Sequence, residues 1–303
     1  MDAVACPFRA RVYRALSENN KTPVDQGVLY VVATPIGNLA DMSQRAIDVL
    51  AQVDRIAVED TRRSGRLLQH FSITTPMQAL HEHNERELAP RLIEQLQQGG
   101  SLALISDAGT PLISDPGFNL VRQAREAGVA VVPVPGASAL IAALSVSGLP
   151  TDRFVFEGFL PAKPVSRRAR LEALRGETRT LIFYESSHRL VECLMDMQVV
   201  FGVDRYVVLA RELTKQFETL HGDGVRNLLH WVQDDPNQQK GEMVLLVQGE
   251  AEAEGHEIDK EAERILLVLL DKLPIKTAAK LTAQITGLNK RALYDRALQL
   301  KEG

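Results

Sequence analysis

The segment ISDAGTPLISDPG, Ile105–Gly117, carries residue types that bind ligands and repeats them within one loop. Ile-Ser-Asp occurs twice, and a glycine follows each copy, so two carboxylates and two flexible backbone positions lie close together in the chain. Carboxylates accept hydrogen bonds from hydroxyl and amino groups, and glycine lets the backbone approach a ligand closely. Because carboxylates repel phosphate, the pattern favours a ligand with hydroxyl and ammonium groups over a polyphosphate.

Three further loops have a comparable composition. They are TPIGN (Thr34–Asn38), the strand-turn-helix sequence VPVPGASALIAALSVSG (Val132–Gly148) and YESSHR (Tyr184–Arg189). Turn chemistry alone explains any one of them, but their recurrence after strand-like runs favours a ligand site. The chain contains no G-x-x-x-x-G-K-[ST] and no G-x-G-x-x-G after its first strand, so the two common nucleotide-binding loops are excluded.

Residues 28–150 alternate between strand-like and helix-like patterns and are predicted to form one domain. The expected strands are Val28–Thr34, Arg55–Asp60, Gln78–His81, residues 102–105 and Val129–Val134. Such alternation predicts a mainly parallel α/β sheet. In these sheets, ligands bind at the loops that follow the carboxyl ends of the strands.

Residues 151–250 are predicted to form a second α/β domain with some antiparallel pairing, because the strand-like runs are longer, more aromatic and partly alternating. The expected strands are Arg153–Phe159, Arg179–Glu185, Arg205–Leu213 and Gly241–Gly249, and the expected helices are Ser166–Leu174 and His188–Gln198.

The two ends of the chain have other compositions. Residues 1–27 are expected to be a tail, and residues 251–303 an acidic linker followed by a helical tail. Within the helical tail, Ala283, Gly287 and Leu293 have the spacing of a helix-turn-helix with glycine at the bend. Residues 274–303 contain six Lys or Arg against two acidic residues. This excess predicts a phosphate-facing module, although two packed helices with a basic solvent face explain it equally well.

The bulk composition is that of an ordinary globular protein: 303 residues, 45% hydrophobic, 24% charged and a net charge of −4. Cys6 and Cys193 cannot form a disulfide framework, which fits a reducing compartment. No apolar run approaches the length of about 18 residues that spans a membrane. We therefore expect a soluble, cytoplasmic protein without a membrane segment. His81 and His83 suggest a metal site, but no further His or Cys with ligand spacing follows closely, so no metal is expected.

Five motifs, in this order, resemble the tetrapyrrole methylase superfamily, and within it the bacterial branch that methylates small-subunit ribosomal RNA. They are TPIGNL, SDAGTPLISDPG, VPGASALIAALSVSGLPTDRF, LIFYESSHR and ARELTKQFE. The resemblance implies two α/β domains of the tetrapyrrole methylase type with S-adenosylmethionine in the cleft between them, plus a small helical tail. It also implies a homodimer that 2′-O-methylates a cytidine in the decoding region of 16S rRNA, acting on the rRNA or the 30S subunit. The tetrapyrrole enzymes usually carry Gly-Gly-Asp-Pro where this chain has Ser-Asp-Ala-Gly-Thr-Pro, which favours the RNA branch.

Carried over by position, the resemblance places the cofactor against several loops, including the segment from Leu112 to Asp115 and the pair Gly241-Glu242. The cofactor-binding residues expected on this basis are Pro35, Gly37, Asp107, Gly109, Leu112, Ser138, Ser186, Leu213 and Gly241.

A ribose hydroxyl is a weak nucleophile, so a base within hydrogen-bond reach would accelerate its methylation. Glu59, Asp60, Arg62 and His83 are the catalytic candidates, with Glu59 or Asp60 as base or orienting group. Asp60 is equally well explained as a helix N-cap. Lys215 is the one lysine that we would test. Basic residues expected to contact RNA phosphates are Arg63, Arg66, Arg167, Arg168, Lys276, Lys290 and Arg291.

Two other functions compete with an RNA ribose methyltransferase. One is a tetrapyrrole C-methyltransferase of the corrin pathway, which the basic tail and the Asp-Ala-Gly-Thr-Pro loop disfavour. The other is a non-catalytic, RNA-binding ribosome assembly factor that retains the cofactor fold. Cofactor binding without turnover would indicate the latter.

Overall fold

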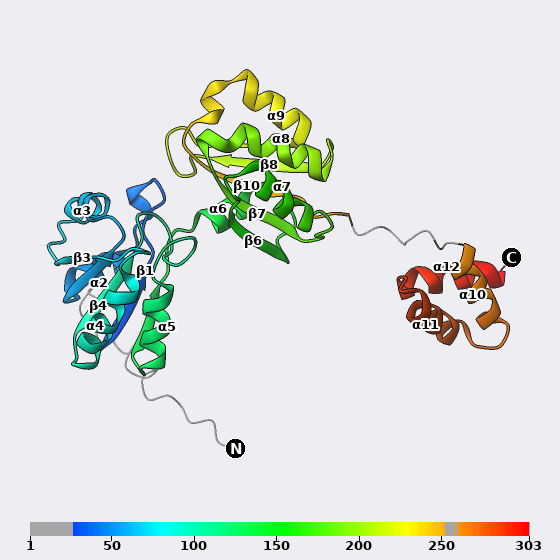
Figure 1. Ribbon diagram of the computed structural model, residues 1–303, viewed down its shortest axis with the longest axis horizontal. Helices are drawn as coiled ribbons and strands as arrows, with labels where there is room; N and C mark the ends of the chain where they lie inside the picture. The colour runs from blue at the N-terminus through cyan, green and yellow to red at the C-terminus, as the bar shows by residue number, and fades with distance from the viewer. Residues whose placement is uncertain (1–26, 252–257, 259, 303) are drawn as a thin grey trace, which may run out of the picture. The chain divides into compact units, whose positions relative to one another are not determined.

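The computed structural model describes residues 27–251, 258 and 260–302 (Figure 1). Most of the tail expected at residues 1–27, including Cys6, and most of the acidic linker lie outside the described residues. The chain divides into two compact units. Unit 1 comprises the chain up to Arg175 and Arg179–Gln248, and unit 2 comprises Gly176–Thr178 and the chain from Gly249 onwards.

The first sheet of unit 1 is parallel throughout and has the strand order β3-β2-β4-β1-β5. Its strands are β1 Val28–Val32, β2 Arg55–Val58, β3 Met77–Ala79, β4 Ser101–Ile105 and β5 Ala130–Val134. The prediction of a mainly parallel sheet is confirmed.

Helices cover both faces of this sheet and form one hydrophobic core on each face. The side chains of β1 alternate between these two cores. Tyr30 and Val32 pack with Val49 and Leu68, whereas Leu29 packs with Leu92 and other residues of the opposite core. The covering helices are α2 Gln44–Gln52 and α3 Thr61–His70 on one face, and α4 Glu85–Gln97 and α5 Phe118–Glu126 on the other. The short 3-10 helix η1, Leu39–Asp41, follows β1. The loops at the carboxyl ends of the strands are thus fixed by a core on each side.

The second sheet has the order β6-β7-β10-β8-β9 and is mixed. β6 and β7 pair in parallel, and the other neighbours are antiparallel. Its strands are β6 Phe154–Phe159, β7 Thr180–Ser186, β8 Tyr206–Arg211, β9 Thr219–Gly224 and β10 Glu242–Val247. The expected antiparallel pairing is confirmed.

One face of the second sheet is covered by three helices, and the other by a helix that precedes the sheet in the chain. The first set is α7 Pro164–Ala173, α8 Leu190–Phe201 and α9 Val225–Asp234. The 3-10 helix η2 Ser187–Arg189 precedes α8, and η3 Pro236–Gln239 follows α9. On the opposite face, α6 Ala139–Val146 packs Leu140 and Leu144 against Ile182 and Val244. Although α6 follows β5 directly, it therefore belongs to the packing of the second sheet.

The strand β9 of the second sheet and the helix α9 that packs on this sheet were not predicted from the sequence. β9 has the sequence TLHGDG, which lacks a strand pattern, and it is held as an edge strand by pairing with β8. β8 ends at Arg211, earlier than expected, because Glu212 and Thr214 adopt positive φ values of 51° and 66° and turn the chain.

Arg167 corrects the RNA-binding prediction, since its side chain is buried. Its guanidinium Nε lies 2.6 Å from Asp196 Oδ2, and its NH2 nitrogen lies 3.3 Å from Glu192. The side chains of Arg167 and Asp196 are only 2% and 3% exposed. Arg167 therefore fixes α7 to α8 and has no surface to offer a phosphate. Arg168 is about half exposed, but its Nε also binds Asp196.

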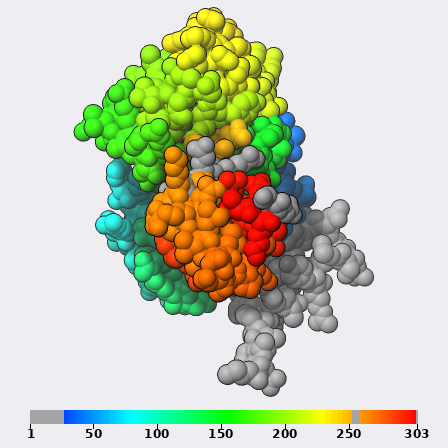
Figure 2. All heavy atoms as spheres, turned by 90° about the vertical axis from the view of Figure 1, so that its right-hand side faces the viewer, coloured from blue at the N-terminus to red at the C-terminus, as the bar shows by residue number. Residues whose placement is uncertain are grey.

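Unit 2 consists of α10 Lys260–Leu270, α11 Ile275–Thr286 and α12 Lys290–Glu302 (orange to red in Figure 2). Leu266, Ala278, Ala279 and Leu293 form its buried core. Gly287 ends α11 in the left-handed conformation, with φ of 74°. The bend expected at this glycine is confirmed. No helix among the described residues of either unit is long and apolar enough to cross a membrane.

Replacement of Asp196 by alanine should destabilise the fold strongly, because it leaves the Arg167 guanidinium buried without its closest partner. Breaking such a buried pair typically costs about 3–5 kcal/mol. We expect the urea midpoint of unfolding to fall accordingly. Glu126→Ala, which breaks the exposed Arg122–Glu126 pair on α5, should leave the midpoint unchanged. Equal midpoints for the two variants would contradict a structural role for Arg167.

Candidate functional site

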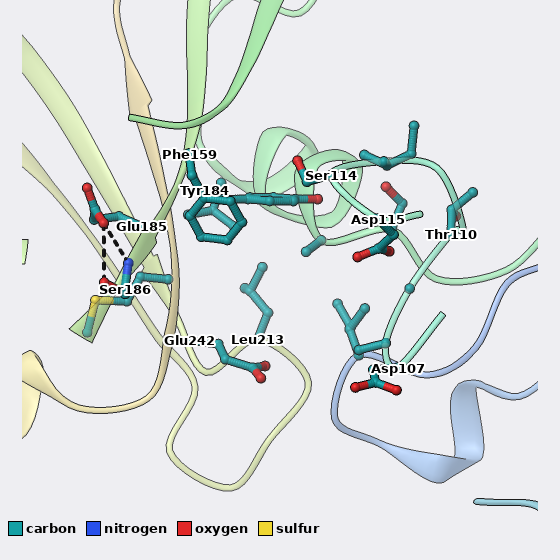
Figure 3. Close-up of a pocket in the computed structure, with 18 of the residues that line it drawn as sticks. Asp107, Thr110, Ser114, Asp115, Phe159, Tyr184, Glu185, Ser186, Leu213 and Glu242 are labelled. Carbon is teal, nitrogen blue, oxygen red and sulfur yellow. Dashed lines mark hydrogen bonds between the residues drawn. The ribbon is translucent and has the colours of Figure 1, made fainter. Parts of the chain in front are cut away.

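A cavity of about 430 Å³ in unit 1 lies among the loops that follow the first sheet and the strand ends of the second (Figure 3). The loops and helices that follow the strands of the first sheet contribute Ile36, Glu59, Arg63, Asp107, Ala108, Gly109, Thr110, Ile113, Ser114, Asp115, Ser138 and Ala139. The second contributes Phe159, Tyr184, Glu185, Ser186, Ser187, Ala210, Leu213, Gly241, Glu242, Met243 and Val244. We call this cavity the main pocket.

The loop after β1 and the loop after β4 are clamped to each other at the main pocket. The backbone N–H of Thr34 donates to the carbonyl of Gly109 at 2.8 Å, and the N–H of Gly109 donates to the carbonyl of Thr34 at 3.0 Å. The Thr34 hydroxyl, which is buried, also donates to the carbonyl of Ser106. Gly109 has φ of 83°, and a Cβ there would lie 3.3 Å from Ile36 Cγ2. Glycine therefore fits both the backbone conformation and the space.

The rest of the repeat loop is held in an unusual backbone conformation. Leu112 and Ser114 have φ values of 73° and 65°, although neither is glycine. Such residues persist only where the surrounding structure over-determines them, and they cluster at functional sites. The Thr110 hydroxyl contributes by donating to the Ala137 carbonyl at 3.0 Å, which ties this loop to the turn before α6.

Three carboxylates in the loops after β2 and β4 lie close enough to influence each other: Glu59, Asp107 and Asp115. Burial and the charge of Asp107 raise the pKa of Glu59. Burial and the charge of Glu59 raise the pKa of Asp115 to about 6, against an opposing hydrogen bond from Ser106. Asp107 is engaged differently: it accepts from the Asp60 N–H at 3.2 Å and pairs with Arg63 at 3.3 Å. The cluster therefore favours a positively charged or proton-donating ligand.

A second charged group reaches the main pocket through Glu242 of β10, whose partner Lys215 lies in the loop after β8 and does not itself line the pocket. Lys215 Nζ lies 2.8 Å from both Glu212 and Glu242. Although burial lowers the pKa of Lys215, the hydrogen bonds to Glu212 and Glu242 raise it above its usual value. A protonated ammonium held by two carboxylates cannot accept a proton, so the structure gives Lys215 a bracing role in place of the catalytic one that we considered.

Aromatic side chains line the other side of the main pocket. Phe159 and Tyr184 meet edge to face with centroids 5.6 Å apart, and Tyr184 accepts a hydrogen bond from the Leu140 N–H at 3.2 Å. Figure 3 draws these rings opposite Asp107 and Asp115. The main pocket thus combines the carboxylates of the first-sheet loops with an aromatic pair from the second sheet, which also contributes Glu185 and Glu242.

A second cavity, of about 550 Å³, adjoins the acidic side, and we call it the outer pocket. It is lined by Glu82, His83, Glu85, Arg86, Asp115, Pro116, Phe118 and Asn119. Glu85 is buried and accepts from the Leu120 N–H at 2.9 Å, which fixes the start of α5. Asn84 makes no side-chain cap for α4, because its Oδ1 accepts from the His81 N–H at 2.8 Å.

Eight of the sequence-predicted site residues line the main pocket. They are Glu59, Arg63, Asp107, Gly109, Ser138, Ser186, Leu213 and Gly241. Pro35, Gly37 and Leu112 do not line it, although a Cβ on Gly37 would lie 2.5 Å from Lys215 Cγ, which explains the glycine by packing.

Asp60, Arg62 and Arg66 are not brought to either pocket. Asp60 is the N-cap of α3, and its carboxylate binds both the N–H and the guanidinium of Arg62. The helix-cap explanation therefore accounts for Asp60. His83 lines the outer pocket only. Among the described residues, no group of three or more His, Cys, Asp or Glu is arranged to hold a metal ion.

Sequence reasoning missed Phe159 as a pocket residue and did not foresee its pairing with Tyr184. Phe159 is part of the strand prediction RFVFEGF, whereas Tyr184 is the first residue of the candidate ligand loop YESSHR. The only available signal was their position at or near strand ends, because their convergence depends on the pairing of β6 with β7, which joins Phe159 to Tyr184 in register.

Comparison with known proteins identifies related sequences over most of the chain. Residues 28–226 match the family described as Tetrapyrrole (Corrin/Porphyrin) Methylases, and residues 256–301 match the RsmI C-terminal HTH domain. The protein named Ribosomal RNA small subunit methyltransferase I of Pseudomonas aeruginosa is 61% identical, over 90% of this chain and 97% of that one. Its namesake in Escherichia coli O157:H7 is 55% identical, over 94% and 99%.

Solved structures share the fold at low sequence identity. Uroporphyrin-III-C-methyltransferase from Thermus thermophilus has a TM-score of 0.53 and 19% identity, covering 73% of this chain and 94% of that one. Diphthine synthase has a TM-score of 0.56 and 18% identity, covering 73% and 89%. At this identity, the likeness concerns the fold alone.

Asp115 should make the stability of the protein depend on pH. Its pKa of about 6 exceeds the ordinary value of 3.8, so the folded state binds the proton more tightly, and stability declines as pH rises through about 6. Asp115→Asn should remove this decline and raise the unfolding free energy at pH 7.5 by on the order of 1 kcal/mol, a figure reduced for partial solvent screening. Urea denaturation between pH 4.5 and 7.5 measures it. The exposed Asp152→Asn should retain the wild-type pH profile, and an unchanged profile in Asp115→Asn would contradict the assignment.

Proposed function

This chain belongs to the tetrapyrrole methylase family, within it to the group named ribosomal RNA small subunit methyltransferase I, and we propose on this premise that it methylates small-subunit ribosomal RNA with S-adenosylmethionine. The observation that carries the proposal is the identity of 55–61% over nearly the full length of those relatives, unit 2 included. The finer proposal is transfer to the ribose 2′-oxygen of a cytidine in the decoding region of 16S rRNA. We also propose that the protein acts in the cytoplasm and as a homodimer.

The main pocket suits S-adenosylmethionine in size and chemistry. Its volume of about 430 Å³ lies within the range of about 300–1,000 Å³ that is typical of small-molecule sites. Asp107, Asp115 and Glu242 can accept hydrogen bonds from ribose hydroxyls or an ammonium group, and they favour a cationic ligand. Ile36 and Leu213 offer apolar surface for the adenine. When bound, the sulfonium supplies an electrophilic methyl group.

The remaining pocket residues are positioned to orient the cofactor through backbone and hydroxyl groups. Gly109 and Gly241 both have positive φ, and a Cβ on Gly241 would lie 2.4 Å from the Glu212 carboxylate. Ser138 begins α6, and Ser186 ends β7 beside Glu185, which accepts from its N–H at 2.8 Å. Because methyl transfer is an in-line displacement, holding the cofactor in a rigid frame of this kind contributes directly to the rate.

RNA phosphates would be bound by exposed basic residues, of which Arg63 also lines the main pocket. On α3, Arg62 and Arg63 have side chains that are 88% and 73% exposed, and Arg66 is also exposed. In unit 2, Lys276 lies on α11, and Lys290 and Arg291 begin α12; all three are exposed. Phosphate contacts position a protein on RNA, whereas selection of the reacting nucleotide requires contacts to its base and ribose.

The proposal is tested by incubating the protein with S-adenosylmethionine labelled in the methyl group and 30S particles from cells that lack the activity. We expect label on one ribose 2′-oxygen in the decoding region, located by nuclease digestion and mass spectrometry. Label on a base would correct the acceptor atom. Binding of the cofactor without any transfer to particles or free rRNA would favour the non-catalytic assembly factor.

A triple variant, Lys276→Ala with Lys290→Ala and Arg291→Ala, should weaken RNA binding and leave cofactor binding unchanged. Each lost phosphate contact lowers the slope of log affinity against log salt concentration by about 1, so a decrease of about 2–3 is expected. Fluorescence anisotropy with an rRNA fragment at several salt concentrations measures this slope. Arg264→Ala is the control, because Arg264 lies in the same unit but is paired with Glu261. An unchanged slope in the triple variant would show that unit 2 binds no phosphate through these residues.

A further inference from the structure

Lys215, Glu212 and Glu242 form a charged cluster that ends at the wall of the main pocket, and we call it the lysine cluster. Lys215 Nζ lies 2.8 Å from Glu212 Oε1 and 2.8 Å from Glu242 Oε2. The side chains of Lys215 and Glu212 are 27% and 18% exposed, so this pair is largely withdrawn from solvent. Glu242 is 74% exposed and lines the main pocket (Figure 3). The charge of Lys215 therefore acts on the pocket through Glu242.

The position of the lysine cluster is fixed from both sheets. The Glu212 N–H donates to the Glu242 carbonyl at 2.9 Å, and the Glu242 N–H donates to the Glu212 carboxylate at 2.9 Å. A Cβ on Gly37, in the loop after β1, would lie 2.5 Å from Lys215 Cγ. The lysine stem thus lies against a loop of the first sheet, while the second sheet holds its ammonium group. Lys215 has little freedom to turn its charge away from Glu242.

Lys215 and Glu212 are both charged at neutral pH. Although burial lowers the pKa of Lys215, its hydrogen bonds to the two carboxylates raise it above the usual value. Although burial raises the pKa of Glu212, the hydrogen bonds from Lys215 and from the Glu242 N–H hold it below the usual value. Two carboxylates and one ammonium group give the lysine cluster a formal charge of −1. Without the ammonium group the charge would be −2.

The main pocket is rich in carboxylates, so the compensation of one of them changes its electrostatics. Among its described lining residues Arg63 is the one basic side chain, against the five acidic residues Glu59, Asp107, Asp115, Glu185 and Glu242. S-adenosylmethionine has a positive sulfonium, whereas the sulfur of its demethylated product, S-adenosylhomocysteine, is neutral. Both compounds have the same adenosyl, ammonium and carboxylate groups. The charge of the pocket is therefore a feature by which the protein can distinguish them.

We propose that Lys215 is a specificity-determining residue of the cofactor site, because its ammonium group limits the preference of the main pocket for the sulfonium cofactor over the neutral product. The inference rests on the function proposed above and adds to it the residue that sets this preference. Glu242 keeps its capacity to accept hydrogen bonds from a ligand, while Lys215 compensates its charge. The pocket then holds the cofactor by shape and hydrogen bonds as well as by charge.

The test is calorimetric titration of the full-length protein with S-adenosylmethionine and, separately, with S-adenosylhomocysteine at pH 7.5 and low salt. Wild type is compared with Lys215→Met, Lys215→Arg and Glu242→Gln. The quantity of interest is the ratio of the two Kd values. Contacts with groups that both ligands share affect both constants alike, so a merely structural role of Lys215 would leave this ratio unchanged.

Lys215→Met should shift the ratio towards S-adenosylmethionine by about 2- to 10-fold, the effect expected of one unit charge across a partly solvated pocket. Glu242→Gln should shift it towards the product by a similar factor, because the cluster becomes neutral. Lys215→Arg retains the charge and should keep the wild-type ratio. Added salt should reduce both shifts. Lys163→Met is the matched control, because Lys163 is exposed before α7 and lines neither pocket.

The outcomes separate this inference from the proposed function. Equal ratios in wild type, Lys215→Met and Glu242→Gln would overturn the role of Lys215, as would shifts of the same sign in both variants. If Lys215→Met binds neither ligand, the shift in Glu242→Gln still decides. Wild type that binds neither ligand would overturn both proposals. Wild type that binds both ligands but transfers no methyl group to 30S particles would overturn the proposed function alone.

Discussion

The site depends first on the reciprocal backbone hydrogen bonds between Thr34 and Gly109. They join the loop after β1 to the loop after β4, two strands that are neighbours in the parallel sheet. Parallel strands deliver all their loops to one edge, but the loops themselves are free to diverge. The Thr34–Gly109 bridge removes that freedom. The chain that follows Gly109 therefore starts from a fixed position. The positive φ angles at Leu112 and Ser114 then restrict the path of the backbone up to Asp115.

The proposed function imposes two opposite electrostatic demands on the protein. A sulfonium cofactor is cationic and suits the acidic cluster of Glu59, Asp107 and Asp115, whereas RNA is polyanionic and is repelled by it. The structure places the negative and the positive side chains at different depths below the surface. The carboxylates lie partly buried in the pocket, where burial raises the pKa of Glu59 and Asp115, and exposed arginines of α3 present the opposite sign at the surface. The net charge of −4 does not reveal this arrangement, because it sums the buried and the exposed charges.

Much of the fold could be predicted from the sequence, since apolar runs and loop composition are local signals. The strands of the first sheet were expected within a few residues of their observed bounds, as were the bend at Gly287 and the mixed second sheet. What failed depended on tertiary contacts. TLHGDG becomes β9 only because β8 offers it an edge, and Arg167 is buried only because Asp196 faces it from α8. A basic cluster in a sequence does not reveal which of its members points inwards.

The same distinction applies to the site. Loop glycines and aspartates were recognisable because their residue types are limited by backbone and hydrogen-bond chemistry. Phe159 was not, because an aromatic in a strand fits a core equally well, and Tyr184 was recognisable only as part of the YESSHR loop. The link between the two sets is α6. Its N-cap Ser138 lines the main pocket, its Leu140 N–H donates to Tyr184, and its Leu144 packs on the second sheet. The chain segment that leaves the first sheet thus fixes the aromatic wall relative to the acidic loops. The pocket geometry therefore depends also on the apolar packing of α6, whose residues lie within the segment VPVPGASALIAALSVSG.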